Sequence, residues 1–232
     1  MLGLASIVMS QFEELELAAW LIVWCALLDT LDGVAARLLK ATSSFGAEFD
    51  SMADVISFGV APAVLTLNAG VQVGNIEYGT DAFWVLLIAS GVFALAGAMR
   101  LARFNIATEK PPPGWFTGVP ITACGGGVLA SFVLVLFYHR EFAASIPLTL
   151  YLPVLLFVLA VLMISRLRFP KATVRDNTLI NVFQIVNIIL IFYCGITRSY
   201  PEYLLGIALV LMVGGIIAGE ISRRRQPRAD AS

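Results

Sequence analysis

Four aspartates lie close together in the sequence, at the ends of two segments that are otherwise apolar: Asp29, Asp32, Asp50 and Asp54. The first two are three residues apart and the last two are four apart, which places each pair on one face of a helix. An ionised Asp near the centre of a bilayer costs roughly 2.5–3.5 kcal/mol on insertion scales. Four such carboxylates therefore require positive charge between them, and hard oxygen ligands without a nearby His or Cys favour Mg²⁺ or Mn²⁺, with Ca²⁺ as a further option, over zinc.

The number of carboxylates predicts more than one ion. One Mg²⁺ normally takes fewer protein carboxylates than four, so we expect a two-metal site with ions roughly 3.5–4 Å apart. Such a site binds a pyrophosphate and stabilises charge as a phosphorus–oxygen bond breaks. Gly33, Ala36 and Gly46 flank the aspartates and leave room for a ligand beside the backbone. Arg37 lies one turn beyond Gly33, where a bidentate contact with a phosphate is expected.

The overall composition indicates a membrane protein. The chain is 59% hydrophobic with a mean hydropathy of +0.88, and 13% of its residues are charged, about half the roughly 25% of soluble domains. We therefore expect an all-α, polytopic membrane helix bundle, formed by a single domain over residues 1–232. The cysteines Cys25, Cys124 and Cys194 each lie alone in an apolar run, which indicates buried small residues rather than a metal site.

Hydropathy predicts about eight helical segments. Leu2–Met9 is too short to span a membrane, and without a basic n-region it does not resemble a signal peptide. Pro62 is expected to kink the span in which it lies, and residues 68–81, 109–114 and 166–178 are loops by composition. The expected spans are Leu15–Leu39, Phe45–Leu67, Ala82–Ala107, Val119–Tyr138, Ile146–Ser165, Leu179–Gly195 and Tyr203–Ile221.

The basic residues predict the orientation. If the spans alternate, all of the 15 Lys and Arg lie on the side of the aspartates except Arg140 and Arg198. The positive-inside rule then places the aspartates at the cytoplasmic face of the cell membrane. His139, the single histidine, lies beside Arg140 on the opposite side and is expected to be an interfacial residue rather than a base or ligand.

The spacing of the motif matches a known pattern. Written as D-x2-D-G-x2-A-R-x8-G-x3-D-x3-D, it resembles the signature of the CDP-alcohol phosphotransferases, integral membrane enzymes of phospholipid synthesis. The segments SFGAEFDSMADVISFGVAPA (44–63), RLARFN (100–105) and FTGVPI (116–121) are similar to the phosphatidylserine synthase branch of that family. Members usually carry a longer first helix, so we expect this chain to begin partway through it.

The resemblance implies a reaction and a role for each residue of the motif. An alcohol hydroxyl, that of L-serine in this branch, attacks the lipid-linked phosphorus of CDP-diacylglycerol and releases CMP. Metal ligands are expected at Asp29, Asp32 and Asp50, and Asp54 is expected to bind metal or to act as the base. The resemblance also implies a homodimer in the lipid membrane and no nucleic-acid partner. The cytidine nucleotide site corresponds to Asp32, Gly33, Ala36, Arg37 and Gly46.

The acceptor site is predicted less directly. Arg100 and Arg103 lie at the expected cytoplasmic end of a span, followed by Asn105. One reading is that these arginines anchor the helix under the positive-inside rule. The other is that one of them, with Asn105, receives the carboxylate of serine or the lipid phosphate, while Ser57 lines the acceptor pocket.

Two other functions remain open from the sequence. The same chemistry could use glycerol phosphate, inositol phosphate or choline as the acceptor alcohol. Membrane-embedded carboxylates also occur in cation-coupled transporters, which would move ions with their substrate and release no CMP.

Overall fold

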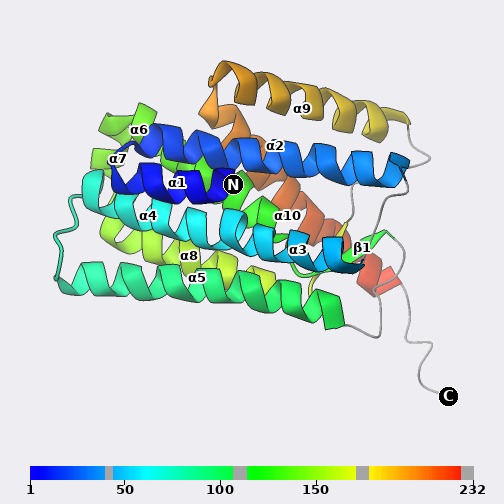
Figure 1. Cartoon of the computed structure of the whole chain (residues 1–232), viewed down its shortest axis with the longest axis horizontal. Coiled ribbons are helices and arrows are strands. Elements are labelled where there is room, and N and C mark those ends of the chain that lie inside the picture. Colours follow the sequence, from blue (N-terminus) through cyan, green and yellow to red (C-terminus); the bar gives the residue numbers. More distant parts are fainter. Residues whose placement is uncertain (40–43, 107–113, 171–177, 226–232) are drawn as a thin grey trace.

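Apolar helices that run side by side form almost all of the described chain, as a computed structural model shows (Figure 1). The structure describes residues 1–39, 44–106, 114–170 and 178–225, with the side chains at 33–39, 44, 47, 178–180 and 225 outside that description. The helices in these ranges are α1 (Leu2–Gln11), α2 (Leu15–Leu39), α3 (Ser44–Asp54), η1 (Val55–Val60), α4 (Ala61–Gln72), α5 (Asp81–Ile106), η2 (Ala123–Leu129), α6 (Ala130–Tyr138), α7 (Arg140–Ser145), α8 (Leu148–Ile164), α9 (Thr178–Thr197) and α10 (Pro201–Arg225).

This architecture confirms the expected all-α membrane bundle. Within the described ranges, three continuous helices are long and apolar enough to cross a membrane: Glu48–Gln72, Asp81–Ile106 and Pro201–Arg224. The first of them runs through α3, η1 and α4 without a break. The predicted span Leu15–Leu39 coincides with α2. The protein is therefore an integral membrane protein.

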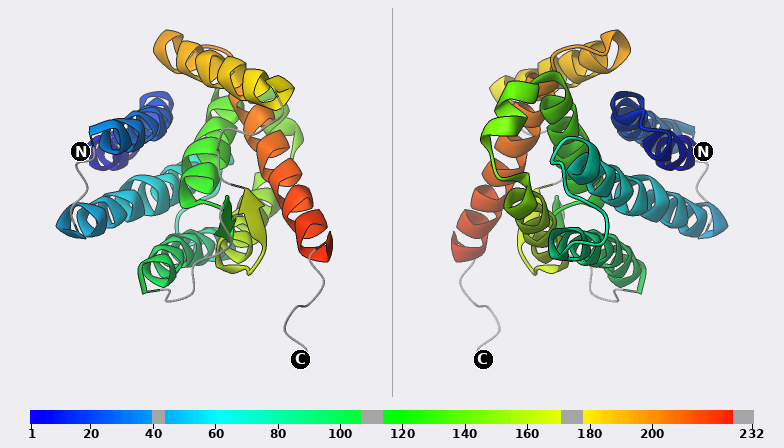
Figure 2. Two further views of the ribbon diagram at one scale, coloured as in Figure 1. Left: turned by 90° about the vertical axis from the view of Figure 1, so that its right-hand side faces the viewer. Right: turned by 90° about the vertical axis from the view of Figure 1, so that its left-hand side faces the viewer.

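The continuous stretch formed by η2 and α6 lies at the centre of the bundle. Viewed along the helices, it is surrounded by α2, α4, α8, α9 and α10 (Figure 2). Most of its residues are buried, among them Cys124, Leu129 and Leu134. This central position follows from composition, because the segment carries apolar residues on every face and no charge.

Two π-helical turns, η1 and η2, pack directly against each other. Only glycine allows this approach, since a Cβ on Gly125 would lie 2.1 Å from the carbonyl oxygen of Phe58. We expected Pro62 to kink its span. The structure places the π-helical turn η1 immediately before α4, with Pro62 in the first turn of α4.

Two short strands join the ends of α5 and α8. β1 (Trp115–Thr117) pairs antiparallel with β2 (Arg168–Pro170), with Phe116 opposite Phe169. The prediction of a plain loop over residues 166–178 is therefore wrong at β2, because a strand this short carries no readable alternation of apolar and polar residues. The loop predicted from Asn68 is also wrong at its start, since α4 continues to Gln72.

The ends of the bundle differ in the elements they hold. The C-terminal ends of α2, α5 and α10, the start of α3 and the strand pair lie at one end, and α7 lies at the other (Figure 1). Arg140, the first residue of α7, is thus far from the aspartates, as the alternation of spans predicts.

Candidate active site

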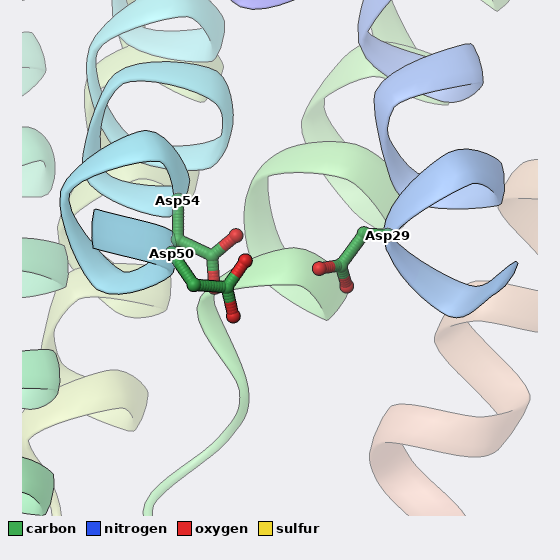
Figure 3. Close-up of side chains that lie close together, drawn as sticks. All are labelled: Asp29, Asp50 and Asp54. Carbon is green, nitrogen blue, oxygen red and sulfur yellow. The ribbon is translucent and has the colours of Figure 1, made fainter. Parts of the chain in front are cut away.

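Three of the four predicted aspartates converge at one end of the bundle. Asp29, Asp50 and Asp54 each offer a carboxylate oxygen, and these oxygens all lie within 4.8 Å of one another. Asp50 and Asp54 project from α3, one helical turn apart, and Asp29 faces them from α2 (Figure 3). We call these three residues the aspartate cluster.

The fourth aspartate lies outside this cluster. Asp32 is exposed on α2, one turn beyond Asp29, and is near enough to repel Asp29 electrostatically. Within the cluster, Asp29 and Asp54 are half-buried while Asp50 is exposed. The cluster therefore has a buried side, toward the centre of the bundle, and a side open to a ligand.

The donor set fits a divalent cation. Carboxylate oxygens are the ligands that Mg²⁺ and Mn²⁺ prefer, and three that are this close repel one another unless positive charge lies between them. In the described part of the chain, none of the three forms an ion pair with a Lys, Arg or His side chain. The cluster is thus a group that could hold a metal ion.

The predicted nucleotide-binding residues are placed only in part. Gly33, Ala36 and Arg37 lie on the last turns of α2, where the side chains are outside the described residues. Gly46 is exposed in the first turn of α3, on the same stretch of helix as Asp50. Their roles remain predictions.

Two of the residues predicted to contact the acceptor are engaged in protein contacts. The Arg103 guanidinium donates to the carbonyl oxygens of Ile164 (2.7 Å) and Ser165 (3.3 Å) at the end of α8, which satisfies carbonyls that the helix leaves free. The Asn105 Nδ2 donates to Glu48 Oε2 (3.0 Å) and to Ser51 Oγ (3.1 Å).

Glu48 and Ser51 are the residues that the sequence analysis missed. Both lie on α3, three residues apart and therefore on one helical face. Through them Asn105 ties α5 to the helix that carries Asp50 and Asp54. Their spacing is visible in the sequence, but the partner on α5 is more than fifty residues away and no local pattern identifies it.

Arg100 has a different environment. Its side chain is 7% exposed, and the described part of the structure gives its Nε no hydrogen-bond partner. It is near enough to Asp54 to interact with that carboxylate electrostatically. Arg100, one of the residues predicted to contact the acceptor, is thus a buried cation beside the aspartate cluster.

Ser57 lies on η1, close to the N-terminal helix. Its Oγ would be 2.6 Å from a Cβ on Gly3, so α1 packs tightly over it. Its predicted role in the acceptor pocket remains a prediction.

An apolar cavity of about 400 Å³ lies between α2, η2, α9 and α10. It extends along one face of α2 as far as Thr30, and the aspartates of the cluster are not among the residues that line it. Other residues that line it include Ala26, Gly127, Ala208 and Leu211.

Comparison with known proteins identifies the family of this chain. Residues 1–217 match the family model described as CDP-alcohol phosphatidyltransferase. A protein of Helicobacter pylori named CDP-diacylglycerol--serine O-phosphatidyltransferase is 38% identical over 193 residues, which cover 82% of this chain and 76% of the relative. A protein of the same name from Methanocaldococcus jannaschii is 33% identical over 215 residues, 93% of this chain and 87% of the relative.

An archaeal relative carries a different name. The archaetidylserine synthase of Methanothermobacter thermautotrophicus is 34% identical over 171 residues, 73% of this chain and 64% of the relative. The family match covers almost the whole chain and includes all three residues of the aspartate cluster. This protein therefore belongs to the CDP-alcohol phosphatidyltransferase family.

Proposed function

We propose that the protein transfers a phosphatidyl group from CDP-diacylglycerol to the hydroxyl of L-serine, giving phosphatidylserine and CMP. The observation that carries the proposal is the convergence of Asp29, Asp50 and Asp54 at one end of an apolar helix bundle, in a member of this family whose relatives are named for this reaction.

The cluster supplies the ligands that the reaction requires. Asp29, Asp50 and Asp54, with Asp32 beside them, would hold one or two Mg²⁺ or Mn²⁺ ions. When bound, such ions supply positive charge that polarises the phosphate and stabilises the charge that develops on its oxygens. Gly33, Ala36, Arg37 and Gly46 are proposed to bind the cytidine nucleotide.

The remaining chemistry is a proton transfer and a displacement at phosphorus. The serine hydroxyl oxygen forms a bond to the lipid-linked phosphorus, and the bond from that phosphorus to the CMP oxygen breaks. Asp54 is half-buried and accepts the proton of the hydroxyl as it attacks. Asp50, one helical turn from Asp54 on α3, helps to hold the phosphate group at which the displacement occurs.

The apolar cavity between α2, η2, α9 and α10 is compatible with a lipid donor. It would accept an acyl chain along the face of α2 that ends at Thr30. The distribution of Lys and Arg supports an active site at the cytoplasmic face of the cell membrane. The proposal includes the homodimer that the family resemblance implies.

The test is CMP release from CDP-diacylglycerol by purified protein with Mn²⁺ or Mg²⁺, with serine, glycerol 3-phosphate, inositol phosphate, choline or no acceptor. We expect serine-dependent release that EDTA and Asp54→Ala abolish. Asp81→Ala is the matched control, because Asp81 is an exposed aspartate at the end of α5 that lies away from the aspartate cluster. Release only with another alcohol would overturn the assignment of serine. No release with any acceptor, together with substrate-dependent ion movement in liposomes, would overturn the enzyme in favour of a transporter.

A further inference from the structure

We propose that Arg100 binds the carboxylate of the acceptor amino acid and thereby selects serine over alcohols that lack this group. The inference rests on the proposed function and deepens it, since it assigns the residue that recognises the acceptor. Arg100 stands out because it is buried beside the aspartate cluster with a donor that has no partner among the described residues.

The first observation is the state of the Arg100 side chain. Only 7% of the residue is exposed, and an arginine this buried is costly unless its charge and its donors are satisfied. Its Nε has no hydrogen-bond partner among the described residues. Asp54 partly compensates the charge electrostatically, but the two do not form an ion pair. Among the described residues, Arg100 therefore keeps a buried donor that an anionic ligand would satisfy.

The second observation is that the other candidates are already engaged. Arg103 donates to the carbonyls at the end of α8, and Asn105 donates to Glu48 and Ser51 on α3. Of the three polar residues in the segment 100–105, Arg100 thus has a donor left for a ligand, whereas Arg103 and Asn105 hold neighbouring helices in place.

The third observation is the position of the helix that carries Arg100 relative to the helix that carries Asp54. Arg100 lies on α5, and α5 and α2 lie on opposite sides of α3 and α4 (Figures 1 and 2). The helices that carry Asp29 and Arg100 thus lie on opposite sides of the helix that carries Asp54. Asp54 therefore has one side toward α2, where Asp29 lies, and another toward α5, where the acceptor is proposed to lie.

Serine chemistry fits this second side. Only Cβ and Cα lie between its hydroxyl oxygen and its carboxyl carbon, so a serine whose hydroxyl donates to Asp54 carries its carboxylate next to that residue. A guanidinium presents paired donors that match a carboxylate in a bidentate contact. Arg100 beside Asp54 therefore supplies the cation in the position where this anion would lie.

The same cation could instead bind the lipid phosphate or serve only to balance the charge of Asp54. These alternatives differ from the proposal in one respect. An arginine that acts on the phosphate or on Asp54 affects the reaction with every acceptor equally, whereas one that binds the acceptor carboxylate affects only acceptors that have it.

The experiment combines Arg100 variants with acceptor analogues. CMP release is measured for wild type, Arg100→Gln and Arg100→Lys with L-serine, 3-hydroxypropionate and ethanolamine. The second compound keeps the carboxylate and lacks the amine, and the third keeps the amine and lacks the carboxylate. Each analogue is followed as an acceptor and as a competitive inhibitor of the serine reaction, so a value is obtained even when an analogue does not react.

We expect Arg100→Gln to raise the apparent KM for serine by roughly 10- to 100-fold, the loss typical of a charge-assisted contact. The inhibition constant of 3-hydroxypropionate should rise by a similar factor and that of ethanolamine should stay within about two-fold. Arg100→Lys should recover part of the loss, because it keeps the charge without the bidentate geometry.

Two results would overturn the inference. An equal effect of Arg100→Gln on all three compounds would assign Arg100 to the phosphate or to Asp54, and no effect on any of them would remove it from the site. Thermal unfolding of each variant in detergent verifies that it is folded. Wild-type release without serine dependence would instead overturn the proposed function, which keeps the two failures distinct.

Discussion

At the scale of single residues, the site is defined by charges that the fold brings together without cancelling them. Asp29, Asp50 and Asp54 come from two helices and lie within 4.8 Å of one another through their oxygens. At such separations like charges repel by about 1 kcal/mol even at the dielectric constant of water. The apo protein thus stores repulsion that a bound cation relieves, and this has a measurable consequence.

Replacing Asp50 by Asn should change stability in opposite directions with and without metal. In EDTA, Asp50→Asn removes a repelling charge, so we expect the Tm in detergent to rise by about 2–4 °C, the shift of a change near 1 kcal/mol in a chain of this size. Mn²⁺ should raise the Tm of the variant by less than it raises the Tm of wild type, because one metal ligand is lost. Thermal unfolding followed by tryptophan fluorescence measures both.

The control for this prediction is Asp81→Asn, an exposed aspartate in the first turn of α5. It should leave the rise in Tm that Mn²⁺ produces unchanged. A rise in the Tm of Asp50→Asn equal to that of wild type would show that Asp50 is not a metal ligand.

A second residue-scale prediction concerns Asn105. Because it holds α3 through Glu48 and Ser51, Asn105→Ala should lower kcat by about 3- to 10-fold, as expected for hydrogen bonds worth roughly 1 kcal/mol. Asn105→Asp should lower it further, since a carboxylate beside Glu48 repels it. The KM for serine should not change, because the proposed carboxylate contact belongs to Arg100.

Steady-state kinetics of CMP release tests this ordering. Asn68→Ala is the matched control, since the Asn68 Nδ2 also donates between helices, to Ser10 Oγ at 2.7 Å, away from the aspartates. A rise in the KM for serine with kcat unchanged would instead make Asn105 a substrate contact and contradict the positioning role.

At the scale of elements, close helix packing depends on glycines whose neighbours are backbone atoms. A Cβ on Gly219 of α10 would lie 1.8 Å from the carbonyl oxygen of Arg168 in β2, whereas one on Gly214 of the same helix meets nothing within 4 Å. Gly219→Ala should therefore destabilise the protein by about 1–3 kcal/mol. Gly214→Ala should stabilise it by up to about 1 kcal/mol through helix propensity.

Thermal unfolding of the two variants in one detergent checks this contrast, because both make the same chemical change in the same helix. Equal shifts in Tm would mean that α10 does not pack on β2 as described. The pairing of β1 with β2 also fixes the ends of α5 and α8, so Gly219→Ala should lower activity as well.

The elements also show which features of the structure the sequence predicts. Hydropathy predicts α2 with its observed bounds, and the intervals between the aspartates predict which of them share a helical face. The convergence of Asp29 with Asp50 and Asp54 is predicted because only a few residues of the sequence separate the two apolar segments. The contacts of Arg103 and Asn105 are not predicted, because each joins positions more than fifty residues apart. The π-helical turns η1 and η2 likewise depend on tertiary packing rather than on a local pattern.

At the scale of the whole molecule, the bundle has two ends of different character. The aspartate cluster and the strand pair lie at the end where α8 finishes, and α7 lies at the end where α8 begins (Figure 1). Among the described Arg residues, all but Arg140 and Arg198 lie toward the first end, so the positive-inside rule predicts that this end faces the cytoplasm. The donor and serine would then both be used from the cytoplasmic side.

This orientation predicts the accessibility of two positions that flank the same helix. Ser145 precedes α8 and Arg166 follows it, and both are exposed. The native cysteines Cys25, Cys124 and Cys194 are free thiols, so single cysteines are introduced after their replacement. In intact cells, a membrane-impermeant maleimide should label Ser145→Cys and leave Arg166→Cys unmodified. After the membrane is permeabilised, both should react, which controls for the reactivity of each thiol. Because the two positions differ only in the end of α8 to which they belong, the reverse pattern would place the aspartate cluster, and with it the proposed reaction, on the outer side of the membrane.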